Sequence, residues 1–197
     1  RVLTYRIAHL MASGVDSFSI LALTFTNKAA REMKARIGDL VGEGEAKNLW
    51  MGTFHSVFAR ILRQEADKLG FPYNFTIYDT QDSDRLISAI IKELGLEKDI
   101  YKYKQVRSRI SAFKNSLITV KAYFNDGDLQ EADAMSRRPK MGAIYKEYVE
   151  RCFKAGAMDF DDLLLKTNEL LNRYPEVLAK YQDRFRYILV DEYQDTN

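Results

Sequence analysis

Two adjacent carboxylates, Asp191 and Glu192, come directly after a compact apolar run, Tyr187–Val190. Such a run predicts a buried strand, which would deliver both side chains rigidly at the end of a sheet. Mg²⁺ prefers oxygen ligands and usually takes one or two protein carboxylates together with phosphate oxygens. Asp191 could therefore help to hold Mg²⁺, while Glu192 could polarise an attacking water as a general base. The alternative is a pair of solvated charges that merely end a strand, because such strings are common.

A second polar segment follows another short apolar run, Ile20–Phe25, where a strand is expected to turn into a helix. An aromatic ring beside a hydroxyl, an amide and an ammonium at such a turn can stack on a base and hold phosphate. We expect Phe25 to stack on a base and Thr26, Asn27 and Lys28 to contact the nucleic-acid backbone. The structural alternative makes Phe25 a core residue and the two residues after it a simple helix cap.

A third polar segment contains Thr53, His55 and Ser56, which come at the start of a predicted helix after the short apolar run Leu49–Met51. Their side chains could donate hydrogen bonds to phosphates, because the helix dipole favours an anion there. A lone histidine near a helix start more often satisfies local hydrogen bonds, so this role depends on its neighbours. The aromatic residues Trp50 and Phe54 fit core packing better than a base platform.

The elements that would position these segments alternate between strand and helix at both ends of the chain. Residues 1–78 and 158–197 combine short apolar runs with helical periodicity, which predicts an α/β fold with a parallel sheet. Residues 79–157 show helical periodicity without a convincing strand, and Asn125–Asp128 is expected to be an exposed turn. The sequence therefore predicts an inserted all-helical subdomain between the two α/β parts.

Two charged groups near this insertion each allow a structural and a functional interpretation. The segment Asp159–Asp162 could bind a metal, but its spacing suits a helix cap with carboxylates in the first turn. A basic helical face could be a solvated surface or could contact duplex DNA. Its residues are Lys102, Lys104, Arg107, Arg109 and Lys114.

Composition excludes several classes of protein without selecting one. The 197 residues carry a formal charge of +2 and 46% hydrophobic residues, which fits a globular chain. One cysteine excludes an internal disulfide framework, and two distant histidines give no zinc-binding spacing. No apolar run reaches the length of a membrane span and no signal-peptide pattern is present. We therefore expect a cytoplasmic protein with no membrane partner.

The segment Asp191–Asn197 closely resembles the second helicase motif of the UvrD/Rep/PcrA family, which belongs to the superfamily-one DNA helicases. Three further segments resemble motifs of this family in the family's order. They are Thr24–Met33, similar to motif Ia, Gly52–Ser56, similar to the next DNA-contacting motif, and Asp159–Leu164, similar to the acidic segment where the first domain resumes. The resemblance extends from Arg1 to Asn197.

This resemblance implies an incomplete RecA-like P-loop NTPase sheet that carries a large all-helical inserted subdomain. Residues 1–78 would be the first part of the ATPase domain, and residues 158–197 the return to it, ending in the Walker B motif. ATP and Mg²⁺ are the implied cofactors of the intact protein, with Glu192 catalytic, Asp191 at the metal, and Arg1 and Gln194 near the nucleotide. Single-stranded DNA and duplex junctions are the implied partners, in repair or replication.

The same resemblance predicts a Gly-rich phosphate-binding loop directly before Arg1, and these residues contain no Gly-x-x-x-x-Gly-Lys-Ser/Thr string. We therefore expect this chain alone not to hydrolyse ATP. We also expect an incomplete sheet, with an exposed strand edge, a looser α/β remnant or non-native self-association. Two alternatives stay open: the helicase part of a recombination helicase–nuclease, and a helical module, 79–157, that binds DNA or protein.

Overall fold

The computed structural model describes residues 2–196 and divides the chain into two compact units. The first unit contains the residues up to Ile61 and those from Asn168 onward, and the second contains Leu62–Thr167. The chain passes from one unit to the other within two helices, α4 (Phe54–Glu65) and α10 (Phe160–Arg173). Each unit has its own hydrophobic core.

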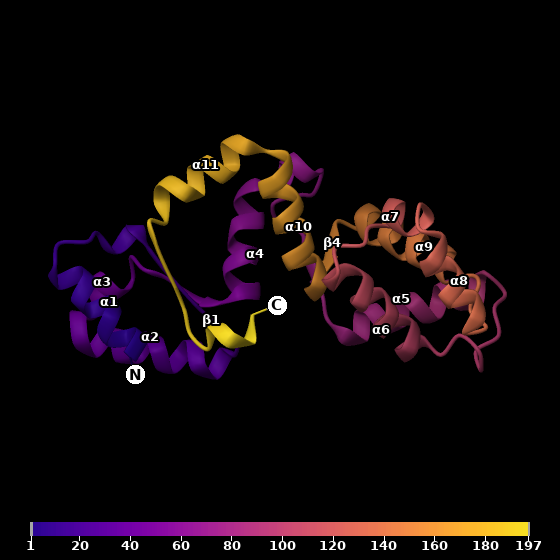
Figure 1. The fold of residues 1–197 in the computed structure, drawn as a ribbon, viewed down its shortest axis with the longest axis horizontal. Helices are drawn as coiled ribbons and strands as arrows, with labels where there is room; N and C mark the ends of the chain where they lie inside the picture. The colour runs from indigo at the N-terminus through magenta and orange to yellow at the C-terminus, as the bar shows by residue number, and fades with distance from the viewer. Residues whose placement is uncertain (1, 197) are drawn as a thin grey trace. The chain divides into compact units, whose positions relative to one another are not determined.

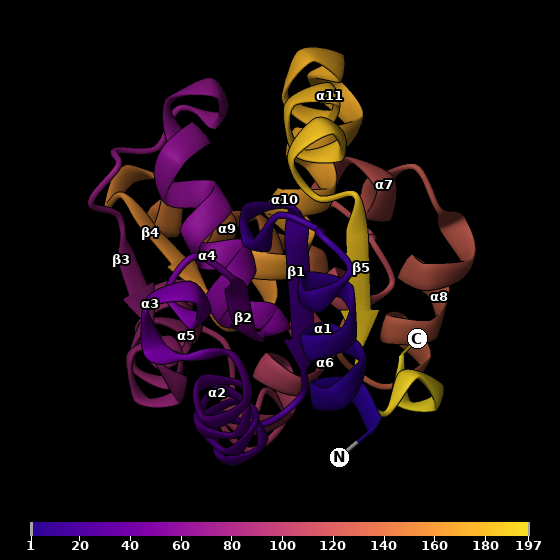
Figure 2. The ribbon, with the colours of Figure 1, turned by 90° about the vertical axis from the view of Figure 1, so that its left-hand side faces the viewer.

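The first unit contains a three-stranded parallel sheet in the order β2 (Trp50–Thr53), β1 (Ile20–Thr24) and β5 (Tyr187–Val190) (Figure 2). Every residue of the central strand is buried, as an apolar run between two partners requires. Thr24 is level with Thr53 in one neighbour, and Leu23 is level with Val190 in the other. The prediction of a parallel α/β sheet is confirmed, and β2 extends further than the apolar run suggested.

Helices cover the sheet of the first unit on both sides (Figure 1). One core joins alternate residues of β1, Ile20 and Ala22, to Met33 and Ile37 of the helix after it. The helices on this side are α1 (Val2–Ala12), α2 (Asn27–Val41) and α3 (Glu43–Ala46). On the other side lie α4 and α11 (Pro175–Arg184), the latter beginning at a proline, a residue that fits the first turn of a helix.

Trp50 joins β2 to the helices on that second side. Its side chain is buried, as predicted, and one arginine from each of these two helices lies over its ring. The guanidinium carbon of Arg60 is 3.9 Å from the ring centroid, and that of Arg184 is 4.6 Å away. The ring of Phe185 packs against it at 5.0 Å. These contacts fasten α4 and α11 to the start of β2.

The strand β5 lies at an edge of this sheet. Within residues 2–196 it pairs with β1 alone. Its first two side chains face solvent, Tyr187 at 40% exposure and Ile188 at 60%. An exposed strand edge is one of the outcomes expected from the sequence, and self-association through it stays a prediction.

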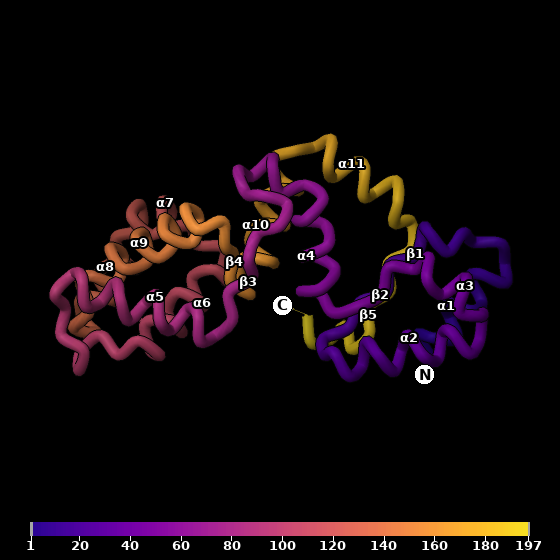
Figure 3. The backbone as a smooth tube through the Cα atoms, turned by 180° about the vertical axis from the view of Figure 1, so that it is seen from behind, coloured from indigo at the N-terminus to yellow at the C-terminus, as the bar shows by residue number. Residues whose placement is uncertain are grey.

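The second unit is mainly helical (Figure 3). Its core consists of apolar and aromatic residues of the helices, with Phe113, Tyr123, Tyr145 and Tyr148 among the largest buried side chains. These helices are α5 (Thr80–Glu93), α6 (Tyr103–Asn115), α7 (Val120–Phe124), α8 (Gly127–Met135) and α9 (Met141–Lys154). Across residues 2–196, no helix is long and apolar enough to cross a membrane.

Two short parallel strands in the second unit were not predicted. They are β3 (Thr76–Tyr78) and β4 (Ala157–Asp159), with Tyr78 level with Asp159. The expectation of no strand between residues 79 and 157 is therefore wrong at its end. Each strand has three residues, which is too short for an alternating pattern to be recognised. The pair joins the segment that enters the helical region to the segment that leaves it.

The expected turn at Asn125–Asp128 is only partly a turn. Gly127 already begins α8, because the carboxylate of Asp126 accepts hydrogen bonds from the backbone amides of Asp128 and Leu129. The compact second unit also extends beyond 79–157 on both sides, to Leu62 and Thr167. The predicted subdomain boundaries at residues 78 and 157 stay a prediction.

Lys114 occupies a buried ionic cluster in the second unit, so its placement on a basic surface is wrong. Its side chain is 1% exposed, and Nζ lies 2.8 Å from Oδ2 of Asp159 and 2.9 Å from Oδ1 of Asp162. The hydroxyl of Tyr148 lies 2.9 Å from the same Oδ2 of Asp159, to which it donates a hydrogen bond. Lys114 follows Phe113 on the buried side of α6, and helical periodicity alone could not reveal its two acidic partners.

The two carboxylates also cap α10, which confirms the structural interpretation of this acidic segment. The amide of Asp162 donates to Oδ1 of Asp159 at 2.8 Å, and the amide of Asp159 donates to Oδ2 of Asp162 at 3.1 Å. Burial alone would raise the pKa of Asp159, but the Lys114 ammonium holds it below the usual range. Burial dominates at Asp162 and raises its pKa. The cluster therefore depends on the Lys114 ammonium, which forms ion pairs with both carboxylates.

Replacing Lys114 by methionine should lower the free energy of unfolding by about 3 to 5 kcal/mol near neutral pH, because it leaves buried carboxylates without a cation. Asp159, with its depressed pKa, contributes stability above its unfolded pKa and loses it as the pH falls through the folded value. The deficit of the variant should therefore shrink as the pH falls toward about 4, where aspartates become neutral. Urea unfolding across pH measures both effects.

The matched control is Lys121→Met, which removes an exposed lysine from α7 in the same unit. We expect it to change stability by less than about 0.5 kcal/mol. Equal effects of the two substitutions, or a Lys114→Met deficit that does not depend on pH, would contradict the buried cluster.

Candidate nucleic-acid and nucleotide site

The three predicted polar segments meet at one edge of the sheet in the first unit. Because β2, β1 and β5 are parallel, their carboxyl ends lie at the same edge. Two contacts join the segments there. The amide of Asp191 donates to the carbonyl of Leu23 at 2.9 Å, and the rings of Phe25 and Phe54 lie 5.1 Å apart. The fold thus brings residues from distant parts of the sequence to a single edge.

The segment after β1 is open to solvent. Phe25, Thr26, Asn27 and Lys28 are all exposed, and Phe25 retains 40% of its surface. Phe25 is therefore not a core residue. The hydroxyl of Thr26 accepts a hydrogen bond from the amide of Ala29 at 3.1 Å and caps α2. The cap and the exposed side chains coexist, so the structural and the binding interpretations of this turn are compatible.

The segment after β2 begins α4. The hydroxyl oxygen of Thr53, which is buried, accepts from the amide of Ser56 at 3.2 Å, and the Ser56 hydroxyl donates to the Thr53 carbonyl at 2.9 Å. His55 and Ser56 are exposed on the first turn. Phe54, predicted to be a core residue, is only half-buried and carries the contact to Phe25. The helix start presents the polar side chains while the threonine fixes its geometry.

The segment after β5 carries the two predicted catalytic carboxylates. Asp191 is half-buried beside β1, and Glu192 is exposed with a left-handed backbone, at φ +53°. This conformation costs a residue other than glycine about 1 kcal/mol. It turns the chain sharply at the end of the strand. The side-chain amide of Gln194 donates a hydrogen bond through Nε2 to Oε2 of Glu192. Arg1, the remaining predicted site residue, lies outside the described residues.

The donor set suits a cation that takes few protein ligands. Among residues 2–196, no group of three or more histidine, cysteine, aspartate or glutamate side chains is placed to hold a metal. Zinc and Ca²⁺ sites need more protein ligands than the pair Asp191 and Glu192 supplies. Mg²⁺ commonly binds through one or two carboxylates and completes its shell with water and phosphate oxygens. The pair therefore fits Mg²⁺ that arrives with a nucleotide.

A parallel sheet with helices on both faces and a polar carboxyl edge places the chain among α/β proteins, a class in which ligands commonly bind beyond the carboxyl ends of the strands. Its sequence matches the family model of the UvrD/REP helicase N-terminal domain over residues 1–197. The chain belongs to this family, which confirms the resemblance of its motifs.

Two curated relatives illustrate the match. The ATP-dependent DNA helicase PcrA of Staphylococcus epidermidis is 44% identical over 198 residues, and that of Staphylococcus aureus is 42% identical over 198 residues. Each alignment covers 100% of this chain and 26% of the relative. The chain thus spans about a quarter of the length of the curated relatives that it matches.

Gly52 packs closely against the first turn of α4, which the sequence alone did not reveal. A Cβ added there would collide with the hydroxyl oxygen of Ser56. Gly52→Ala should therefore rotate that hydroxyl away from the Thr53 carbonyl and cost about 1 kcal/mol of stability. Adding Ser56→Ala should remove the collision, so the two changes should be coupled in a double-mutant cycle of urea unfolding. Additive effects would contradict this packing.

Proposed function

We propose that the chain is part of the first RecA-like domain of an ATP-driven motor that moves on single-stranded DNA and unwinds duplexes. The observation that carries this proposal is the meeting of three segments with family motifs at one sheet edge. The family and the names of the relatives, ATP-dependent DNA helicase PcrA, support the same function. The activity belongs to the longer protein.

The DNA-contacting part of the proposed site is formed by the segments after β1 and β2. Phe25 offers an exposed ring for base stacking, and its contact with Phe54 limits the orientations that the ring can adopt. Thr26, Asn27 and Lys28 lie beside it at the start of α2, where the helix dipole favours a phosphate. Thr53, His55 and Ser56 would extend the phosphate contacts along the start of α4.

The nucleotide part of the proposed site is formed by the segment after β5. Asp191 would hold Mg²⁺ together with water and the phosphates of ATP, and the ion would neutralise charge on the transferred phosphoryl group. Glu192 would accept a proton from the attacking water as general base. Gln194 would hold the Glu192 carboxylate through its amide and contact the nucleotide. Arg1 is proposed as a further nucleotide contact on the family resemblance alone.

The proposed nucleotide site lacks a phosphate cradle within these 197 residues, because they contain no Gly-x-x-x-x-Gly-Lys-Ser/Thr string. Carboxylates alone would repel the phosphates of ATP rather than bind them. We infer that this chain by itself binds single-stranded DNA without turning over ATP.

Phe25→Ala should weaken binding of a labelled oligothymidine by about 5- to 150-fold, because a stacked base contributes about 1 to 3 kcal/mol. Lys28→Ala should lower the dependence of log affinity on log salt concentration by about 0.7, the value for one phosphate contact on a single strand. Fluorescence anisotropy at several salt concentrations measures both quantities.

The matched controls are Phe18→Ala and Lys47→Ala. Phe18 is 52% exposed on the short 3₁₀ helix Ser17–Ser19 before β1, and Lys47 is exposed between α3 and β2, so both precede a strand rather than follow it. Neither change should alter affinity or its salt dependence. Losses equal to those at Phe25 and Lys28 would refute the proposed DNA site.

In the full-length protein, Glu192→Gln should reduce DNA-stimulated ATP hydrolysis by about 100-fold or more while retaining binding of ATP and oligothymidine, because it removes the base and keeps the shape. The 197-residue chain should show no hydrolysis above background with Mg²⁺ and DNA present. Steady-state phosphate release measures both. Unchanged turnover in the variant would assign the general base to another residue.

A further inference from the structure

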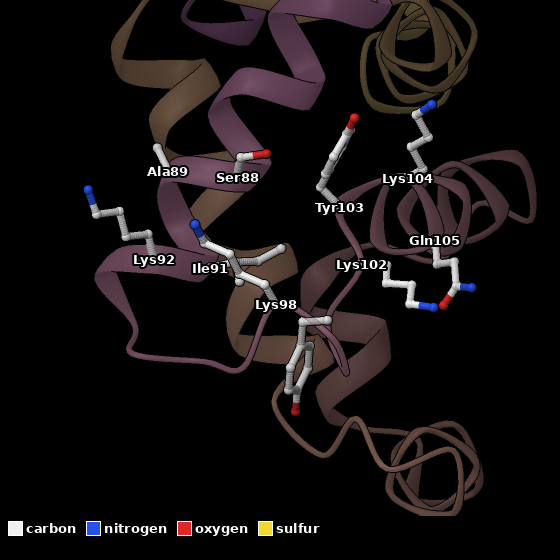
Figure 4. Close-up of a pocket in the computed structure, with 10 residues that line it drawn as sticks. Ser88, Ala89, Ile91, Lys92, Lys98, Lys102, Tyr103, Lys104 and Gln105 are labelled. Atoms are coloured by element: carbon white, nitrogen blue, oxygen red, sulfur yellow. The ribbon is translucent and has the colours of Figure 1, made fainter.

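A groove of about 730 Å³ lies between α5 and the start of α6, within the second unit (Figure 4). Its apolar lining includes Ala89 and Ile91 of α5 and the ring of Tyr101. Tyr101 is buried, and its hydroxyl accepts a hydrogen bond from the backbone amide of Lys140 at 3.0 Å, which fixes the ring in place. Packing and this hydrogen bond therefore hold the buried side of the groove in place.

Four lysines line the same groove: Lys92, Lys98, Lys102 and Lys104. All four are exposed, and none forms an ion pair with a carboxylate within residues 2–196. Figure 4 shows them coming from α5, from the loop after it and from the first turn of α6. No carboxylate among the described residues neutralises these four ammonium groups.

The other cations of α6 behave differently. Nη1 of Arg107 lies 3.0 Å from Oδ1 of Asp84, and Nε of Arg109 lies 3.0 Å from Oδ1 of Asp133. Lys114 forms ion pairs with the buried Asp159 and Asp162. The basic face expected from the sequence thus divides into a neutralised part and an open part, the open part being Lys102 and Lys104.

Nothing in the first turn of α6 compensates the charge of the groove. Lys102 precedes the helix and makes no side-chain cap, and the first turn contains no acidic residue. The positive end of the helix dipole therefore adds to the lysines. Glu97 and Asp99 are close in sequence but do not line the groove. Glu93, near the end of α5, is already paired with Arg151.

We propose that this groove binds an acidic segment of a partner protein in which an apolar side chain lies between carboxylates. Charge complementarity selects the acidic flanks, and the accessible apolar surface of Ala89 and Tyr103, above the buried Ile91 and Tyr101, selects the apolar side chain. Arginine or lysine clusters are the usual device for recognising acidic motifs in peptides. The site is separate from the sheet edge proposed to contact DNA and does not depend on that proposal.

The lining favours a peptide over a nucleic acid. A single strand binds through phosphates and through bases stacked on exposed rings. Here the ring of Tyr101 is buried and already packed, so Tyr103, at 40% exposure, is the aromatic surface left in the lining. Uncharged hydrogen-bonding groups for base edges are few, mainly Ser88 and Gln105. An aliphatic or aromatic side chain would bury the apolar lining more completely than a base with polar edges.

The test measures binding of a short fluorescein-labelled peptide, in which leucine and phenylalanine lie between runs of glutamate, to the 197-residue chain. Lys98→Glu combined with Lys102→Glu should weaken binding by about tenfold or more, because like charges then face the peptide. Ala89→Phe, which fills the groove without changing charge, should weaken it by a similar factor. The matched control is Lys121→Glu with Lys154→Glu, which makes the same change in net charge on exposed lysines outside the groove.

Three results together support the proposal. Both groove variants lose binding, the control retains it, and a peptide with serine and glycine in place of leucine and phenylalanine binds more weakly. Thermal melting of each variant reports whether it folds, and a variant with a lowered melting temperature is replaced by Lys104→Glu or Ser88→Trp. Absence of binding to the unaltered chain, equal loss in the control, or tighter groove-dependent binding of a labelled oligothymidine than of the peptide overturns it.

Discussion

Parallel pairing on both sides of β1 is the constraint on which the candidate site depends. Because β2 and β5 run in the same direction as β1, the ends of all three strands must lie at one edge. The pairing continues one residue beyond β5, where the Asp191 amide bonds to Leu23. Any shift of register would move the carboxylates relative to Phe25, since a shift by one residue reverses the faces of a strand.

The helical unit depends on a different interaction, the buried ammonium of Lys114. It lies between a residue at the end of β4 and a residue in the first turn of α10, so one charge fixes the point where the chain leaves the helical region. Such a cluster contributes more to defining one arrangement than to net stability, because desolvation offsets much of the attraction. In the first unit, the polar side chains of the candidate site lie at a solvent-exposed sheet edge. In the second unit, the charges of Lys114, Asp159 and Asp162 are buried.

The strands of the first unit and the turns that follow them could be predicted from the sequence, because uninterrupted apolar runs ending in polar residues indicate buried parallel strands. The two strands of the second unit could not, since three residues give no pattern. The basic face of α6 shows the same limit. Periodicity placed its cations on a helix, but the partners of Arg107, Arg109 and Lys114 are 23 to 48 residues away in sequence, and only tertiary structure brings them together.

We propose that single-stranded DNA binds along one sheet edge of the first unit. Photo-crosslinking of an iodouracil-substituted single strand to the chain, followed by mass spectrometry of the adducts, tests it most directly, because crosslinking requires contact with the base. We expect adducts at Phe25 and at the start of α4, and none at Phe18, although Phe18 is more exposed than Phe25. Adducts confined to Phe18 or to the tyrosines of the helical unit, with Phe25 unmodified, would contradict it.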